Sequence, residues 1–348
     1  MADKDKIDSV LKRIQKIVNA AGSPPVIVLG SGASISYGIA SMWEIQERLK
    51  VFFGAHDYSH KESKDAVAKF MDNLSRGMGL EEALLHVSMP EEVETDIVDE
   101  VWKLIASQDY DVFKRVLNGE KIDLKRLFEY LIYMRPDTIL NVVSTNYDKI
   151  AEYAASQAGA YINTGFASTY LGGFKSSLEA YPNHFKNSYI GLINIWKVHG
   201  SLDWFEQGNQ VYNIPNMHEI PAGYKPCIIT PGKNKYEKTH QSPHRELLER
   251  IDKCFNAAQG FLCIGYGFND EHVHPVLLEN AQQRHSTIII VTKDITDPIR
   301  RNVMDGNHDY IAIYDNGHEG CYIEYPGETL EITDKKYWIL NDFCSIIM

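Results

Sequence analysis

Short apolar runs alternate with longer amphipathic stretches along this chain. The apolar runs predict strands at residues 25–29, 138–144, 193–198, 226–230, 260–265 and 286–292. Apolar residues three and four positions apart predict helices at 41–52, 149–157, 243–258 and 271–283. Residues 288–291 are apolar without interruption, which is typical of strands that are buried on both faces. Strands alternating with helices predict an α/β fold, a Rossmann-like parallel sheet with helices on both faces.

A helical block interrupts this alternation. Residues 59–135 carry apolar side chains at helical spacing almost throughout and have few β-branched runs. We therefore expect two parts: residues 1–55 and 136–348 form the Rossmann-like domain, and residues 56–135 form an inserted α-helical lobe.

Two other segments are less regular. Residues 161–187 are rich in glycine, serine, asparagine and aromatic residues, which predicts a loop with short strands. The stretch after Asp294 predicts two short strands and a last helix at 336–348. Because residues 337–348 are unusually apolar for a chain end, we expect them either to pack on the core or to make a subunit contact.

Composition narrows the class of protein. The 348 residues include 35 Lys and Arg against 47 Asp and Glu, a net charge of −12, which argues against a general nucleic-acid or membrane surface. The five cysteines form no C-x-x-C pair, which argues against a disulfide framework and a zinc ribbon. No apolar run approaches the ~20 residues of a membrane span, and the start lacks the apolar core of a signal peptide. We expect a cytoplasmic protein with no metal site.

Candidate chemistry follows the strands, because open parallel sheets bind ligands at the carboxyl ends of their strands. After the first strand comes Gly30-Ser-Gly-Ala-Ser34, whose small residues allow a phosphate to approach the backbone. Ile35 stands where a dinucleotide-binding motif has its third glycine, and no Gly-Lys-Ser/Thr follows. A tight strand-to-helix turn is the alternative interpretation.

The other strand ends add polar groups. Thr145, Asn146 and Asp148 follow the second strand, and His199 precedes a glycine further on. A later strand ends in a glycine turn with polar residues, namely Gly265, Tyr266, Asn269 and Asp270. Helix capping is the alternative role of Asp148 and Asp270. The histidine pairs 240/244 and 272/274 are interpreted as surface groups, since neither has a fitting third ligand.

Taken in order, these loops resemble those of the sirtuin superfamily. Residues 30–34 with Gly38-Ile39 are similar to the first sirtuin loop, and Thr145-Asn-Tyr-Asp148 to the Thr-Gln-Asn-Ile-Asp segment. His199-Gly-Ser201 matches the His-Gly catalytic segment, and residues 265–270 stand where the Gly-Thr-Ser phosphate loop belongs.

The departures point to one branch of that superfamily. Deacetylating sirtuins have a four-cysteine zinc ribbon and a Pro-Asp-Phe-Arg continuation of the first loop; this chain has Ala40-Ser-Met-Trp43 there and no C-x-x-C. The chain looks instead like the bacterial sirtuin-like proteins of anti-phage defence systems. That resemblance implies cleavage of NAD+ to ADP-ribose and nicotinamide by an abortive-infection effector, with no metal. It also implies control by homo-oligomeric assembly or by a separate partner such as a HerA-type ATPase.

The resemblance also assigns roles. It implies that Asn146 orients a water or the ribose and that His199 accepts a proton. It implies NAD+ contacts from Gly30, Ser31, Gly32, Ala33, Ser34, Thr145, Asp148, Gly265, Tyr266, Asn269 and Asp270, the first loop acting through backbone amides. Two other functions stay open, an NAD-dependent protein deacylase and a non-catalytic module that binds NAD or ADP-ribose. A further interpretation is that the protein is a structural subunit with a vestigial pocket.

Overall fold

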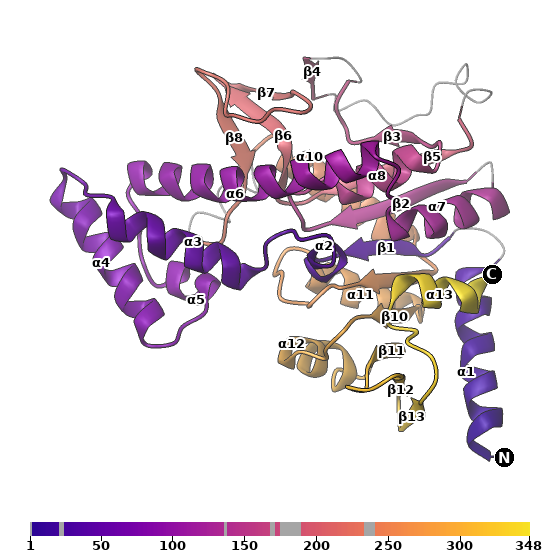
Figure 1. Cartoon of the computed structure of the whole chain (residues 1–348). Helices are drawn as coiled ribbons and strands as arrows, with labels where there is room; N and C mark the ends of the chain where they lie inside the picture. The colour runs from indigo at the N-terminus through magenta and orange to yellow at the C-terminus, as the bar shows by residue number, and fades with distance from the viewer. Residues whose placement is uncertain (1, 21–23, 136–137, 168–170, 175–188, 233–240) are drawn as a thin grey trace.

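The computed structural model describes residues 2–20, 24–135, 138–167, 171–174, 189–232 and 241–348 (Figure 1). Its main sheet has nine strands in the order β13-β12-β11-β10-β9-β1-β2-β5-β3. The parallel part consists of β1 (Val26–Leu29), β2 (Ile139–Ser144), β3 (Tyr161–Asn163), β5 (Leu192–Lys197), β9 (Gly260–Ile264), β10 (Thr287–Val291) and β11 (Tyr310–Asp315). Every residue of β1, β9 and β10 is buried, as expected for a sheet that is covered on both faces. The predicted Rossmann-like α/β fold is confirmed.

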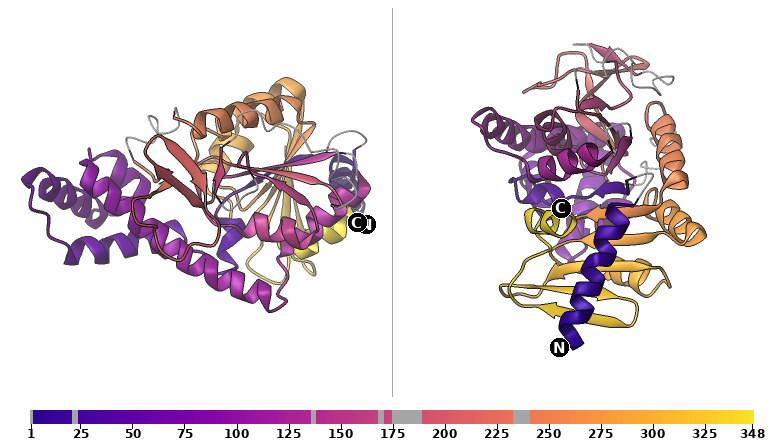
Figure 2. Two further views of the ribbon diagram at one scale, coloured as in Figure 1. Left: turned by 90° about the horizontal axis from the view of Figure 1, so that it is seen from above. Right: turned by 90° about the vertical axis from the view of Figure 1, so that its right-hand side faces the viewer.

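Helices cover both faces of this sheet (Figure 2). Successive side chains of a strand point to opposite faces, so Ile27 and Leu29 pack into one core cluster and Val26 and Val28 into the other. The first face is covered by α1 (Ala2–Val18), α7 (Asp123–Met134), α8 (Ile150–Gln157) and α13 (Leu340–Ile347). The second is covered by α10 (His244–Ala257), α11 (His274–Arg284), α12 (Asp297–Ile299) and the π-helical η2 (Arg300–Met304).

The predicted helical block contains four helices. α4 (Lys61–Ser75), α5 (Leu80–Leu85) and the first half of α6 (Glu91–Leu117), with α3 (Met42–Ala55) before them, extend to one side of the sheet (Figure 1). α3 begins with a capping box in which Ser41 and Glu44 satisfy each other's backbone amides. The indole of Trp102 on α6 donates to the carbonyl oxygen of Leu202 at 2.8 Å, which ties the long helix to the rest of the molecule. The fourth helix, α7, packs on β2 and α8 and so covers the sheet.

A second, antiparallel sheet was not expected. Its order is β4-β7-β6-β8, with β4 (Gly172–Gly173), β6 (Gly200–Gln207), β7 (Gln210–Asn213) and β8 (Lys225–Ile228). The prediction of a strand at 226–230 is correct in kind, but that strand pairs with β6 and not with the parallel sheet. The predicted loop at 161–187 lies partly outside the described residues.

The first and last helices of the chain, α1 and α13, pack against each other (Figure 1). The side-chain Nδ2 of Asn19, just after α1, donates to the carbonyl oxygen of Ile347 at 2.9 Å. The hydroxyl of Tyr130 on α7 donates to the same oxygen at 2.6 Å. Phe343, Cys344 and Ile347 are buried, so the apolar tail packs on the core. Three strands follow Asp294 where we expected two, β11 and the antiparallel β12 (Cys321–Tyr325) and β13 (Glu328–Ile332). Among the described residues, no helix combines the length and apolar character that a membrane span requires.

Candidate active site

A cavity lies where β1, β2 and β9 end and where the chain leaves β5. It encloses about 980 Å³ of space, its open mouth included. Most of the predicted site residues line it, namely Gly30, Ser31, Ser34, Thr145, Asn146, Asp148, His199, Tyr266, Asn269 and Asp270. Gly32, Ala33 and Gly265 lie behind this wall. The sheet brings these loops together because the carboxyl ends of parallel strands share one edge.

The turns after β1 and β9 touch each other through glycines. A Cβ atom on Gly30 would lie 2.5 Å from the carbonyl oxygen of Gly265, whose own φ is +56°. The first turn leads into α2 (Gly32–Ile35). The amides of Gly30, Gly32, Ala33 and Ser34 donate to the carbonyl oxygens of Ile264, Gly265, Gly30 and Ser31 over 3.2, 3.0, 3.0 and 2.9 Å. The backbone amides that we expected to bind a diphosphate therefore already donate to carbonyl oxygens of the two turns. The amide of Ser31 is the exception.

The side chain of Asn146 is held in one orientation. Its Nδ2 donates to the carbonyl oxygen of Gly30 at 2.8 Å and to the hydroxyl of Ser34 at 3.1 Å. Because a carbonyl oxygen only accepts, the first contact assigns which end of the amide is nitrogen. Oδ1 accepts no hydrogen bond from the described residues, so it remains available to a ligand or a water in the cavity.

His199 contacts two acceptors. Its Nδ1 lies 3.3 Å from the carbonyl oxygen of Thr145, and its Nε2 lies 2.7 Å from Oδ2 of Asp270, although without hydrogen-bond alignment. Both side chains are less than one-tenth exposed. Thr145 offers only an acceptor, so a hydrogen bond there requires hydrogen on Nδ1, and Nε2 faces the carboxylate of Asp270.

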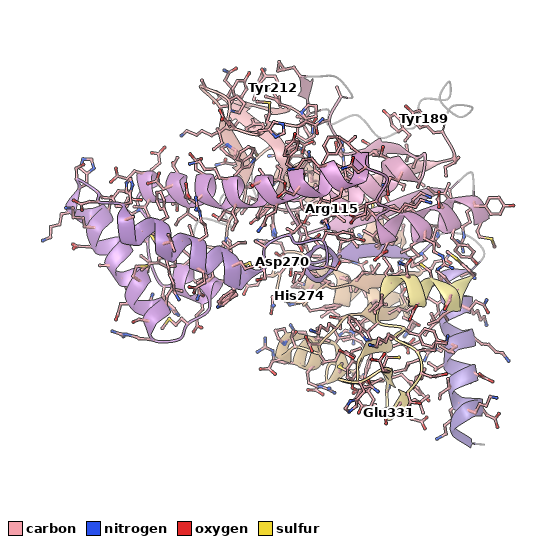
Figure 3. The ribbon with its side chains drawn as sticks, in the orientation of Figure 1. Arg115, Tyr189, Tyr212, Asp270, His274 and Glu331 are labelled. Carbon is pink, nitrogen blue, oxygen red and sulfur yellow. The ribbon has the colours of Figure 1, made fainter. Side chains whose placement is uncertain are left out.

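Asp270 also shapes its own turn. Its Oδ1 accepts from the amides of His272 and Val273 at 2.9 and 3.1 Å, just before α11 begins. Asp270 lies near the centre of the molecule with His274 close by (Figure 3). We expected Asp270 either to cap a helix or to contact adenosine. In the structure its carboxylate bonds to the turn that precedes α11, whose N-cap residue is Val273, and it also contacts His199.

Asp148 serves its own helix and the first turn together. Its Oδ1 accepts from the amide of Ile150 at 3.1 Å, and the Ser34 hydroxyl also hydrogen-bonds to it. Burial raises the pKa of Asp148, and the nearby Lys197 opposes that rise. Ser34 therefore links Asn146 with Asp148 beneath the cavity.

A fully buried lysine supports these loops from behind. Nζ of Lys197 donates to the carbonyl oxygens of Tyr147, at 3.1 Å, and of Asp148, and it lies 3.1 Å from Oε1 of Glu152. Burial alone would lower the pKa of Lys197, but the carboxylates of Glu152, Asp148 and Asp203 outweigh burial and raise it. Sequence reasoning missed this residue, because an isolated lysine at a strand end normally reaches solvent.

α3 and the helical lobe also contribute to the wall of the cavity. Met42 and Ile45 on α3, Glu81 on α5 and Ile105 on α6 line it. The amide of Ala40 donates to Oε1 of Gln108 on α6 at 2.8 Å, so α6 holds the loop that follows the first turn. Sequence reasoning missed these residues, since an apolar helical face looks the same whether it lines a cavity or a core.

The expected surface histidines are not all at the surface. His244 is buried, with its ring near Trp204 and its Nδ1 3.2 Å from the carbonyl oxygen of Val198. The interpretation of His244 as a surface group is wrong, because α10 turns this side chain toward the β5–β6 connection. His240 lies outside the described residues. The described part of the chain contains no cluster of three or more His, Cys, Asp or Glu side chains arranged for a metal ion.

Comparison with known proteins finds a family model that matches part of the chain. Residues 140–311, from β2 to β11, match the family model described as the SIR2-like domain. The matched stretch is just under half of the chain. Asn146, His199 and Asp270 all lie within it, and the helical lobe lies outside it. No curated protein matches the chain.

Solved structures match over almost the whole chain. A mutant Sir2 homologue in complex with 2′-O-acetyl ADP ribose is 14% identical, with 97% of this chain and 96% of that chain covered and a TM-score of 0.50. A Sir2 homologue in complex with NAD is 13% identical, with 97% and 93% covered and a TM-score of 0.49. At this identity the first match shows the fold. The resemblance to sirtuins is thus confirmed at the level of the fold.

Proposed function

We propose that this protein hydrolyses NAD+ to ADP-ribose and nicotinamide in the cavity around Asn146 and His199. The observation that carries the proposal is the fixed amide of Asn146. Its nitrogen is held by Gly30 and Ser34, and its free Oδ1 lines the same cavity as the His199–Asp270 pair. A group that only packs or caps a helix needs no such unengaged acceptor. The matched Sir2 homologue in complex with 2′-O-acetyl ADP ribose supports the choice of ligand.

The chemistry needs little acid catalysis. The bond between nicotinamide and ribose breaks through an oxocarbenium-like state, as glycosidic bonds do, and nicotinamide leaves as a neutral molecule. Oδ1 of Asn146 accepts a hydrogen bond from the attacking water and so fixes it for the reaction. A basic group in the cavity then has to accept one proton from that water.

His199 and Asp270 receive this proton together. When the pair holds a shared proton, Nε2 and Oδ2 stay in contact. When it has released that proton, two acceptors face the cavity, and the pair takes the proton of the water as the new bond forms. Asp270 then stabilises the positive charge on the imidazole, and the contact seen in the structure is restored.

The same proposal gives the biological setting. By its resemblance to the sirtuin-like proteins of anti-phage defence, the chain acts as an NAD-depleting effector of abortive infection. An effector toxic to its host has to stay inactive until triggered, so we propose control by homo-oligomeric assembly or by a partner of the HerA-type ATPase class. The division into residues 1–55 with 136–348 and a lobe of 56–135 belongs to this proposal, with the lobe as a wall of the active site.

The test is direct measurement of NAD+ loss. Purified protein, alone and with the product of a neighbouring ATPase gene, is incubated with NAD+, and ADP-ribose and nicotinamide are quantified by chromatography. Asn146→Ala and His199→Ala should each lower turnover by about 10²-fold or more. Asn118→Ala and His318→Ala are the matched controls, since both side chains are exposed and neither lines the cavity.

The outcomes separate the alternatives. Nicotinamide release that requires an acetylated peptide would replace the hydrolase with an NAD-dependent deacylase. Binding of NAD+ without turnover in the assembled complex would replace it with a binding module. Full activity in either cavity variant would contradict the proposed roles of Asn146 and His199.

A further inference from the structure

A second cavity lies between the helical lobe and the small antiparallel sheet. It encloses about 880 Å³ of space, its open mouth included, and Ile229 forms part of the wall of both cavities. Cys227 on β8 and His244 on α10 line the second cavity together. Sγ of Cys227 lies 3.5 Å from Nε2 of His244, a normal length for a hydrogen bond that involves sulfur.

The hydrogen bonds of His244 fix the direction of this contact. Its Nδ1 lies 3.2 Å from the carbonyl oxygen of Val198, which can only accept, so Nδ1 carries hydrogen. In the neutral ring Nε2 is then the bare nitrogen, and it accepts the S–H of Cys227. If the proton moves to Nε2, both bonds persist, because an imidazolium donates from both nitrogens. His244 is therefore oriented as a base for the thiol.

Cys227 differs from the other cysteines of the chain. Cys263, Cys321 and Cys344 are buried, and burial raises the pKa of each thiol. Cys254 is partly exposed like Cys227, but burial raises its pKa and its Sγ donates to Oδ1 of Asn141 at 3.3 Å. Cys227 thus combines partial exposure with a contact to an imidazole nitrogen.

Charges at the second cavity select what can approach. Glu91, Glu94 and Asp99 line it from α6, and Glu206 lines it from β6. Among the described residues that line this wall, Lys225 is the lysine, and it lies 3.7 Å from Glu91. An acidic rim attracts cationic reagents and repels anionic ones.

We propose that Cys227 and His244 form a nucleophilic thiol site, separate from the cavity around His199, that exchanges with small cationic disulfides. His244 takes the thiol proton, and the thiolate attacks one sulfur of the disulfide. A bond forms between Sγ of Cys227 and that sulfur while the disulfide bond breaks. The second half leaves as a thiolate and receives the proton from His244, so the exchange involves no further oxidant.

The test compares two disulfides of similar size and opposite charge on the full-length protein. Cystamine carries an amine at each end and 3,3′-dithiodipropionate a carboxylate at each end. Modification of Cys227 and of Cys254 is followed over time by peptide mass spectrometry at neutral pH. Each rate is divided by that of the same disulfide with the neutral thiol N-acetylcysteinamide. Cystamine should modify Cys227 about tenfold faster than Cys254, and faster than the acidic disulfide does.

A variant tests the base. In His244→Asn the amide nitrogen can still donate to the carbonyl oxygen of Val198, but no basic nitrogen faces the thiol, so modification of Cys227 should slow about tenfold. His318→Asn is the matched control on an exposed loop and should leave the rate unchanged. Equal rates at Cys227 and Cys254, faster reaction with the acidic disulfide, or an unchanged rate in a folded His244→Asn would each overturn the proposal. If that variant does not fold, the rates of Cys227 and Cys254 with the two disulfides in the wild-type protein decide the test. None of these measurements depends on NAD+ turnover.

Discussion

Nε2 of His199 lies 2.7 Å from Oδ2 of Asp270, at the edge of the sheet where the parallel strands end. His199 comes just after β5 and Asp270 lies in the turn after β9, and these strands are separated in the sheet by β1 and β2. The pair therefore closes over the ends of the two central strands, where Asn146 follows β2. In the proposed hydrolysis, this pair takes up the proton of the attacking water.

Replacement of Asp270 by asparagine tests this pair. Asn can still accept from the amides of His272 and Val273, so the fold should be retained, but its amide cannot stabilise a positive charge on His199. We expect turnover of NAD+ to fall by about 10²-fold at an unchanged melting temperature. Asp334→Asn, an exposed carboxylate distant from the cavity walls, is the control for removing one negative charge. Wild-type turnover in Asp270→Asn would show that the contact is purely structural.

The buried Lys197 provides a stability test. Lys197→Met leaves the buried carboxylates of Asp148 and Glu152 without their cation, which should lower the free energy of unfolding by about 3 to 5 kcal/mol at neutral pH. Burial raises the pKa of both carboxyl groups, so the folded variant binds protons more tightly than the unfolded chain does. Stability of the variant should therefore rise as the pH falls from about 8 to about 5.

Denaturant unfolding at several pH values measures this effect. The variant should approach the wild-type protein toward acid pH, and Lys197→Met combined with Glu152→Gln should recover part of the loss. Lys293→Met removes an exposed lysine and should change little. A difference between Lys197→Met and wild type that is the same at every pH would mean that the carboxylates stay unprotonated and that the account of this cluster is wrong.

The sequence predicts where each strand lies and ends more clearly than which strands are neighbours in the sheet. Apolar runs place Asn146, His199 and Asp270 just after strands, since each run ends where the chain leaves the sheet. Which of these ends meet depends on the strand order, and no local spacing encodes that order. The contact between His199 and Asp270 was missed for this reason, although both residues were predicted to belong to the site.

Other misses have the same physical origin. The apolar residues of β6 follow no regular alternation, because Trp204 and Phe205 are both buried between different neighbours. The sequence predicts a surface position for His244, because it does not show that Val198 and Cys227 contact the two ring nitrogens in the fold. Lys197 is a buried charge that only long-range carboxylates make acceptable.

Gly200 follows His199 and lies against the backbone of Cys227, so its substitution has a specific expected outcome. Its φ is +86°, and a Cβ atom there would overlap the carbonyl oxygen of Cys227. Gly200→Ala should therefore displace β8 or the loop of His199, and lower the free energy of unfolding by more than the ~1–2 kcal/mol of a left-handed residue. Gly208→Ala is a matched control, because its φ is +62° but open space surrounds the Cβ position. Equal losses in the two variants would show that the contact with Cys227 does not constrain the backbone.

Asp109 anchors the helical lobe to the loop that carries Asn146. Its Oδ1 accepts from the amide of Lys149 at 2.8 Å and its Oδ2 from the hydroxyl of Tyr153 at 2.6 Å, and the side chain is buried. Asp109→Ala leaves both donors without an acceptor and should cost about 2 to 4 kcal/mol, whereas Tyr153→Phe removes one bond and should cost about 1 kcal/mol. Because α6 also places Ile105 in the cavity wall, Asp109→Ala should raise the KM for NAD+ more than it lowers kcat. Denaturant titration and steady-state kinetics on both variants measure this. A KM in Asp109→Ala equal to that in Tyr153→Phe would mean that the lobe holds its position without this contact.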